Sequence, residues 1–96
     1  MELFLFARLH ARAGVEGQLE RAIAEVQRPT SEEDGCLGYR AFRSVRDPRE
    51  YYVHSRWRDQ AAFDHHARLP HTLRFVSVVE PLLDHPFAVS LTAALA

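Results

Sequence analysis

The sequence contains no lysine and only one cysteine, and both scarcities exclude whole classes of chemistry. All 12 basic residues are arginine. A Schiff-base lysine and the lysine of a phosphate-binding P-loop are therefore excluded. Cys36 stands alone, which excludes an internal disulfide and a cysteine-based zinc cluster. No apolar run approaches the roughly 20 residues that a membrane-spanning helix needs.

An excess of charge of one sign is also absent. The 12 basic and 13 acidic residues leave a net charge of −1, which argues against a nucleic-acid-binding or membrane-surface protein. The apolar start, Met1 to Ala7, is short and lacks a basic region, so we expect no targeting segment and a cytoplasmic location. With 47% hydrophobic and 26% charged residues, the composition is that of one ordinary globular domain spanning residues 1–96.

The spacing of apolar residues predicts the secondary structure. Alternation is typical of strands, and recurrence at i, i+3, i+4 and i+7 is typical of amphipathic helices. We expect Asp59 to cap a helix and Pro70 to start another. The expected elements are a strand at 3–9, a helix with Leu19, Ala22, Ile23 and Val26 inward and closed by Pro29, strands at 36–45 and 51–58, helices at 60–68 and 71–79, and a last strand or arm at 87–95.

The element order β-α-β-β-α-β predicts a ferredoxin-like α+β fold. Its antiparallel sheet carries the helices on one face, and its other face must be solvated or covered by another molecule. The strand at 3–9 offers phenylalanines on one face and leucines on the other. We therefore expect the second face to pair with a twofold copy, which gives a homodimer.

Histidines gather in the segment that follows the third predicted strand. On the predicted helix, His66 falls on the apolar face with Ala62 and Leu69, one turn from Phe63, whereas His65 points toward solvent. Imidazole titrates near neutral pH, so His66 could exchange protons with a flat substrate held by Trp57 or Phe63. The alternative is a core histidine whose nitrogen binds a backbone carbonyl.

Two other clusters of side chains could form a site. His65, His66 and His71 do not form the i, i+4 pair that places two metal ligands on one helical face, so we expect no metal. Six arginines lie between Arg40 and Arg58. They could recognise a carboxylate or phosphate, or they could simply cover a solvated hairpin.

Several short motifs resemble the antibiotic biosynthesis monooxygenase family when taken in order. They are Gly35-Cys36-Leu37-Gly38-Tyr39, a strand ending in Trp57, His66, and Pro70-His71, and the resemblance extends from Leu3 to about Leu91. Val53 and Ala7 stand where the polyketide-oxidising and haem-degrading branches carry asparagine. The pattern is nearest to the quinol monooxygenase and autoinducer-2-processing relatives.

The resemblance implies a dimeric α+β barrel with one pocket per subunit, between sheet and helices. It implies oxidation of a small quinol-like or enolisable aromatic compound by O₂, with no cofactor and no metal. By the same resemblance, His66 acts as the base or as a hydrogen-bond partner, and Trp57 shapes the pocket or touches the substrate. His71 orients the substrate or lines the entrance, and Tyr39 and Phe63 are further pocket residues.

Two alternatives stay open at this point, because a fold does not imply a function. One is a non-catalytic dimeric module that binds a small aromatic or quinone-like molecule. The other is an isomerase of a small signalling metabolite, which uses the same histidines as acid and base. Arginines converging on the pocket favour the isomerase, since a phosphate needs them. Arginines pointing outward favour an apolar substrate.

Overall fold

The structure is a computed structural model that describes all 96 residues. It contains one four-stranded sheet in the order β2-β3-β1-β4, and every neighbouring pair is antiparallel. This is the ferredoxin-like α+β fold that the element order predicts. The elements are β1 (Leu3–His10), α1 (Glu16–Ser31), β2 (Cys36–Arg43), β3 (Glu50–Trp57), α2 (Gln60–Arg68), α3 (Pro70–Val79), the short 3-10 helix η1 (Glu80–Leu82) and β4 (Ala88–Thr92).

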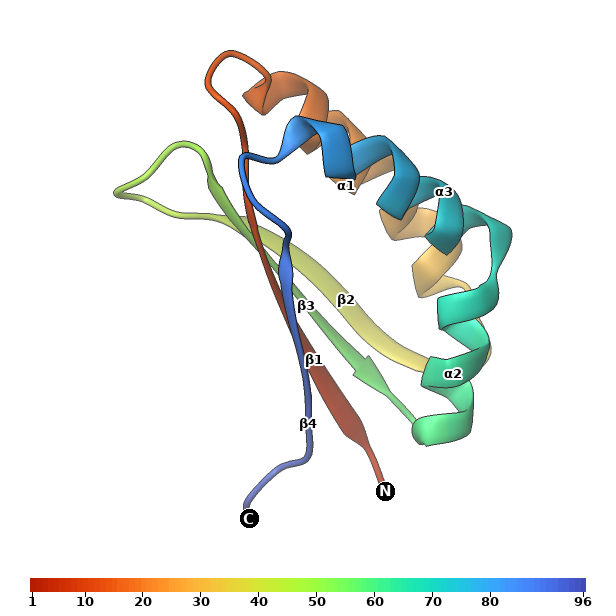
Figure 1. The fold of residues 1–96 in the computed structure, drawn as a ribbon. Coiled ribbons are helices and arrows are strands. Elements are labelled where there is room, and N and C mark those ends of the chain that lie inside the picture. Colours follow the sequence, from red (N-terminus) through yellow and green to blue (C-terminus); the bar gives the residue numbers. More distant parts are fainter.

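The helices all lie on one side of the sheet (Figure 1). The helices α1 and α3 run side by side across it, and α2 lies at the end where β3 finishes. Strand alternation explains this arrangement, since Leu3, Ala7 and Leu9 of β1 are buried whereas Phe6 and Arg8 between them are exposed. None of the helices is long and apolar enough to cross a membrane.

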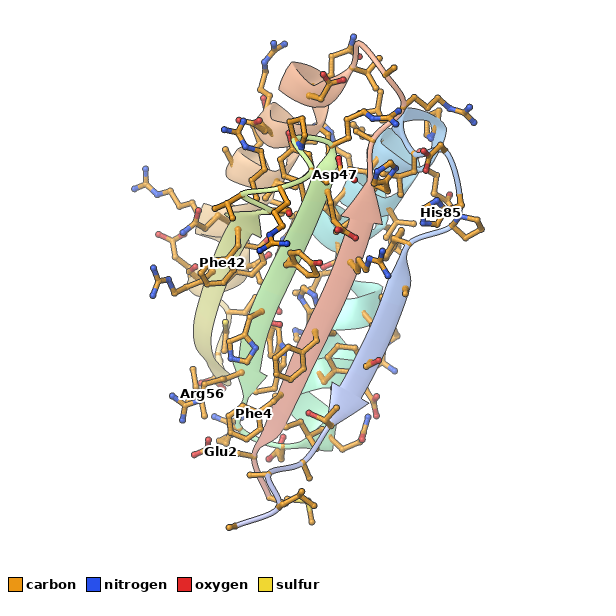
Figure 2. All side chains as sticks on the ribbon, turned by 90° about the vertical axis from the view of Figure 1, so that its left-hand side faces the viewer. Glu2, Phe4, Phe42, Asp47, Arg56 and His85 are labelled. Carbon is orange, nitrogen blue, oxygen red and sulfur yellow. The ribbon has the colours of Figure 1, made fainter.

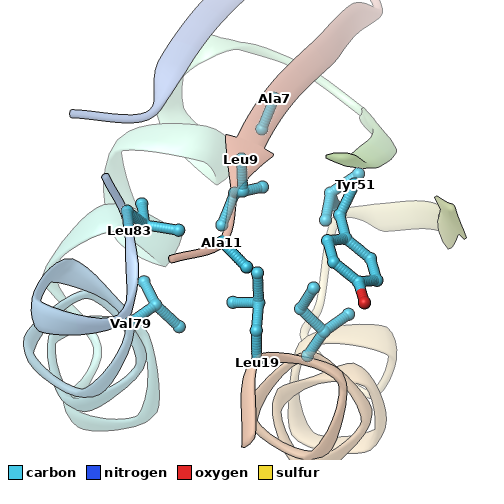
Figure 3. Close-up of a cluster of buried hydrophobic side chains, with 9 residues drawn as sticks. Ala7, Leu9, Ala11, Leu19, Tyr51, Val79 and Leu83 are labelled. Carbon is cyan, nitrogen blue, oxygen red and sulfur yellow. The ribbon is translucent and has the colours of Figure 1, made fainter. Parts of the chain in front are cut away.

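The main core joins the inward face of the sheet to α1 and α3 (Figure 3). Leu9 of β1, Leu19 of α1 and Val79 of α3 are almost completely buried there. A second, smaller cluster lies at the α2 end, where Trp57 packs with Leu3 and Ala62. The site described below lies between these two clusters.

The opposite face of the sheet carries no helix, and Figure 2 looks directly onto it. Exposed aromatic residues follow its strands, with Phe6 52%, Phe42 43% and Tyr52 40% exposed. His54 stacks on Phe6, and the guanidinium of Arg56 lies over the ring of Phe4. An apolar surface of this kind is unusual for a protein that is monomeric in water.

Two predicted boundaries were wrong by a few residues. Helix α1 runs through Pro29 to Ser31, because a proline in the last turn removes only one helical hydrogen bond, and Glu32 N–H still reaches the carbonyl of Arg28. Strand β2 ends at Arg43, and Val45 is fully exposed in the turn that follows. The predicted helix cap at Asp59 is confirmed, since its Oδ1 accepts from Ala62 N–H at 2.9 Å.

Gly35, just before β2, lets its backbone approach α2 closely. We therefore expect Gly35→Ala to destabilise the protein more than Gly14→Ala. Both glycines have positive φ, +92° and +90°. A Cβ on Gly35 would lie 2.6 Å from Ala62 Cβ, whereas a Cβ on Gly14 meets nothing within 4 Å. Gly14→Ala should cost about 1 kcal/mol from backbone strain, and Gly35→Ala about 2–3 kcal/mol. Urea unfolding of both variants measures this, and equal losses would contradict a steric role for Gly35.

A second histidine cluster ties together the far end of the sheet. His10 contacts Asp84 through Nδ1 at 2.7 Å and Asp47 through Nε2 at 2.8 Å. Both ring nitrogens can donate only when the imidazole is protonated. The hydrogen bond with Asp47, followed by that with Asp84, raises the pKa of His10 above its ordinary value of 6.5.

The raised pKa of His10 determines whether the stability of the protein rises or falls with pH. Because the pKa of His10 is higher in the folded state, its contribution is complete below the unfolded value of 6.5 and is lost as pH rises through the folded value. We expect the urea midpoint to fall as pH increases above 6.5, and His10→Gln to flatten that decline. A decline that is equally steep in His10→Gln would assign it to another group.

Candidate functional site

A cavity of about 190 Å³ lies between the sheet and the helices. All four strands and all three α-helices contribute to its wall, which is mostly apolar. Its size, below the roughly 300–1,000 Å³ of sites for drug-sized ligands, indicates a small ligand. The lining residues are Leu5, Ala7, Leu9, Val26, Thr30, Tyr39, Val53, Ser55, Phe63, His66, Ala67, Thr72, Phe75, Val76, Phe87 and Val89.

His66 is the ionisable imidazole of this wall, and local structure holds it in place. The Asp59 cap starts α2 directly after β3, so that Phe63 and His66 face the sheet. The ring of His66 packs against the indole of Trp57, with 4.4 Å between centroids. Trp57 is itself fixed by complete burial and by its Nε1–H, which donates to Ser55 Oγ at 3.0 Å.

Glu33 joins two of the predicted site histidines. Its Oε2 lies 2.8 Å from His66 Nδ1 and 2.6 Å from His71 Nε2. The Glu33 side chain is only 6% exposed, and its second oxygen, Oε1, is buried with no hydrogen-bond partner in the chain. A buried carboxylate needs hydrogen-bond donors or a compensating charge, and the side-chain partners of Glu33 are these two imidazoles.

The carboxylate sets the tautomer of His66. An Nδ1–H that donates to Glu33 leaves Nε2 with its lone pair, and Nε2 has no partner within the chain. Since His66 lines the cavity, this arrangement provides a proton acceptor for a bound ligand. The Thr72 hydroxyl, 3.3 Å from Nδ1, closes the same group on the α3 side.

Besides Ser55 and Thr72, two further residues with hydroxyl groups, Tyr39 and Thr30, line the cavity. Burial, and secondarily the nearby Cys36, raises the pKa of Tyr39 to about 12, so its phenol keeps its proton at neutral pH and can donate a hydrogen bond. Thr30 on α1 is almost completely buried, and its Oγ1 has no partner in the chain. A ligand oxygen would satisfy either hydroxyl.

The structure brings the predicted site residues together in two layers. Tyr39, Phe63 and His66 line the cavity. Trp57 is not on the cavity surface but lies directly behind His66. His71 reaches Glu33 from the outer side, where it lines a shallow groove between α1 and α3.

Sequence reasoning missed two residues of the site. Glu33 looked like part of a polar stretch that ends a helix, and no spacing rule links it to His66, 33 positions away. The signal available was three consecutive acidic residues before Gly35, which is weak by itself. Thr30 was missed because we expected Pro29 to end the helix, which would place Thr30 outside it.

Comparison with known proteins identifies the family of this chain. The family model described as antibiotic biosynthesis monooxygenase matches residues 3–78. The chain belongs to the antibiotic biosynthesis monooxygenase family. It is 33% identical to Rv0793 of Mycobacterium tuberculosis, provisionally named a monooxygenase, over 91 residues that cover 95% of this chain and 89% of that protein.

Solved structures of family relatives superpose closely on this fold. The structure of Rv0793 from Mycobacterium tuberculosis gives a TM-score of 0.95 at 30% identity, covering 100% of this chain and 97% of the other. PA3566 from Pseudomonas aeruginosa gives 0.91 at 33% identity, covering 99% and 95%. The predicted family and the predicted fold are therefore both confirmed.

The arginines separate two of the functional alternatives in this family member. No arginine lines the cavity. Arg56 lies over Phe4 and binds Glu2 at 2.7 Å on the open face of the sheet (Figure 2). Arg40 lies over Phe42 and pairs in register with His54 of the same face. A phosphorylated ligand would lack its usual guanidinium partners in this cavity, so the geometry favours an apolar one.

Proposed function

We propose that the protein is a cofactor-independent monooxygenase that oxidises a small quinol-like or enolisable aromatic compound with O₂. The observation that carries the proposal is the pairing of an apolar cavity with one imidazole, His66, whose free nitrogen is set by a buried carboxylate. Such a site can remove a proton from an acidic C–H or O–H group and keep the resulting anion away from water.

The proposed chemistry needs only substrate, O₂ and the chain's own residues. For an anthrone-type CH₂ group, His66 Nε2 takes a proton, and the carbanion donates electrons to O₂ to form a carbon-bound peroxide that takes the proton back. Loss of the second C–H proton to His66 then breaks the O–O bond and forms the ketone. The departing hydroxide recovers that proton as water, so CH₂ and O₂ become C=O and H₂O.

Two hydroxyls support this sequence electrostatically. The neutral phenol of Tyr39 and the unpartnered hydroxyl of Thr30 can each donate a hydrogen bond to the enolate oxygen as its charge develops. Trp57 acts as a positioning residue, because its indole supports the ring of His66 from behind. Phe63 provides an aromatic wall for a flat substrate.

The direct test is O₂ uptake by purified, chelator-treated protein with a panel of anthrones and reduced naphthoquinols. We expect uptake with at least one compound, with one O₂ consumed per anthrone and the ketone as product. Stoichiometric binding of these compounds without O₂ uptake would replace the proposal with the non-catalytic binding module.

We also propose that the open face of the sheet pairs with a second copy of the chain to form a homodimer. The support is the row of exposed aromatic rings on a face that no helix covers. Pairing two such faces would bury Phe6, Phe42 and Tyr52 and would complete an α+β barrel with helices on the outside. It would also add apolar burial that a 96-residue domain has little of by itself.

Phe6→Glu is expected to prevent this pairing. Phe6 lies in a central strand of the open face, so the new carboxylate would be buried without a partner, and the dimer dissociation constant should rise by about 100-fold or more. Sedimentation velocity at several concentrations measures this. Val45→Glu, which adds the same charge at a fully exposed turn position, is the control and should stay dimeric. A Phe6→Glu protein that sediments like wild type would remove the open face as the interface.

A further inference from the structure

We propose that Glu33, His66 and His71 form a binding site for one divalent transition-metal ion, with Zn²⁺ as the reference ion. The two imidazole nitrogens and Glu33 Oε2 all lie within 4.8 Å of one another. The three residues come from the loop after α1, from α2 and from the first turn of α3. The site is thus assembled by tertiary packing, which is why sequence spacing gave no sign of it.

The donor set is chemically suited to such an ion. Two imidazoles and one carboxylate are a common zinc ligand combination, with bonds of about 2.0–2.2 Å and a fourth position for water. Imidazole-rich sites favour Zn²⁺, Co²⁺, Ni²⁺ and Cu²⁺ over Mg²⁺ or Ca²⁺, which prefer oxygen. The present contacts of 2.8 Å and 2.6 Å need only open slightly to admit the ion in place of the shared protons.

The burial of Glu33 and its unpartnered oxygen are the independent observation that points to a cation. Its side chain is more than nine-tenths buried, and Oε1 has no hydrogen-bond partner in the chain. No arginine pairs with it; its side-chain partners are the two histidines. A divalent ion would compensate the buried charge and give the orphaned oxygen a metal to coordinate.

The ion would lie behind His66 rather than in the cavity. Neither Glu33 nor His71 lines the cavity, and His71 instead borders the outer groove between α1 and α3, which gives an ion a route from solvent. An ion bound at Nδ1 would leave the proton of His66 on Nε2, so the loaded protein should lose its proposed base, and metal binding is a property distinct from the reaction with O₂. It can be measured without any substrate.

The chain offers a built-in reporter and two matched controls for the test. Trp57 is the only tryptophan, and its ring lies 4.4 Å from that of His66, so a paramagnetic ion at the site should quench its fluorescence. His65 is the exposed neighbour of His66 on the same helix. His85 belongs to the other place where histidines and a carboxylate meet, with His10 and Asp84.

The experiment is a Co²⁺ titration of chelator-treated, tag-free protein, followed by visible absorption and by Trp57 fluorescence, with Zn²⁺ competition. We expect one ion per chain, ligand-field bands of low coordination number and quenched fluorescence. Glu33→Gln and His71→Ala should each weaken binding by about 100-fold or more, since even outer partners of a ligand are worth 10–100-fold. His65→Ala and His85→Ala should bind as wild type does.

Three results would overturn the proposed metal site. One is the absence of Co²⁺ binding to the folded protein. A second is binding that Glu33→Gln and His71→Ala leave unchanged. The third is binding that His85→Ala abolishes, which would move the ion to the far end of the sheet. Because Glu33→Gln preserves shape and His71 is partly exposed, circular dichroism should confirm that both variants fold.

Discussion

Replacing His66 with alanine is expected to lower O₂ uptake by about 10²–10⁴-fold, the usual contribution of a positioned general base. The expectation follows from the lone pair on Nε2, which the Glu33 contact at Nδ1 leaves free. No other cavity residue can replace it, because Tyr39, with a pKa of about 12, stays protonated at neutral pH. The measurement is the rate of O₂ uptake by chelator-treated protein with the best substrate of the panel.

His65→Ala is the matched control for that variant. It removes an imidazole from the adjacent position of the same helix, but from the exposed side. We expect it to retain wild-type uptake, which would exclude a general effect on α2. A His66→Ala protein that is folded and consumes O₂ at the wild-type rate would refute the assignment of His66 as base.

Replacing Trp57 with alanine is expected to cost about 3–5 kcal/mol of folding free energy, the range for deleting a buried aromatic side chain. Trp57 is 0% exposed and packs on Leu3, Ala62 and Phe63. It is the centre of the smaller of the two core clusters. The free energy of unfolding of a native protein is about 5–15 kcal/mol in total, so the variant should lose a large share of its stability.

Thermal and urea unfolding measure the loss, and the melting temperature should fall by about 4–8 °C per kcal/mol. Trp57→Phe is the control, because it keeps an aromatic ring but removes the hydrogen bond to Ser55. It should cost clearly less than Trp57→Ala. A stable Trp57→Ala protein with reduced ligand affinity would instead indicate that the indole contacts the substrate.

The fold could be predicted because its local signals agree with one another. Alternation along β1 and β3, the i, i+3, i+4 pattern of α1, the Asp59 cap and the Pro70 start all indicate the same architecture. The errors lie at the ends of helices and strands, where the local sequence signals conflict. Pro29 is a helix breaker in the interior but is tolerated in a last turn, and the sequence pattern does not distinguish the two cases.

Periodicity predicted cavity residues only on one helix, whereas Tyr39 was predicted from the family resemblance. The inward direction of His66 and Phe63 follows from the period of α2, and both line the cavity. The contact of Glu33 with His66 and His71 depends instead on how the loop before β2 packs against α2 and α3. The position of Trp57 behind His66 rather than on the cavity wall is likewise set by packing depth, which periodicity does not report.

The division of the cavity between two layers has an evolutionary consequence. The ionisable cluster is held by the helices and one loop, whereas the sheet contributes mainly apolar positions such as Leu5, Val53 and Val89. Substitutions among these apolar positions reshape the cavity without touching the hydrogen bonds around Glu33. The shape of the cavity and its ionisable cluster can thus diverge independently, so that one small scaffold can come to accept different ligands through substitutions in the sheet while the Glu33–His66–His71 cluster stays constant.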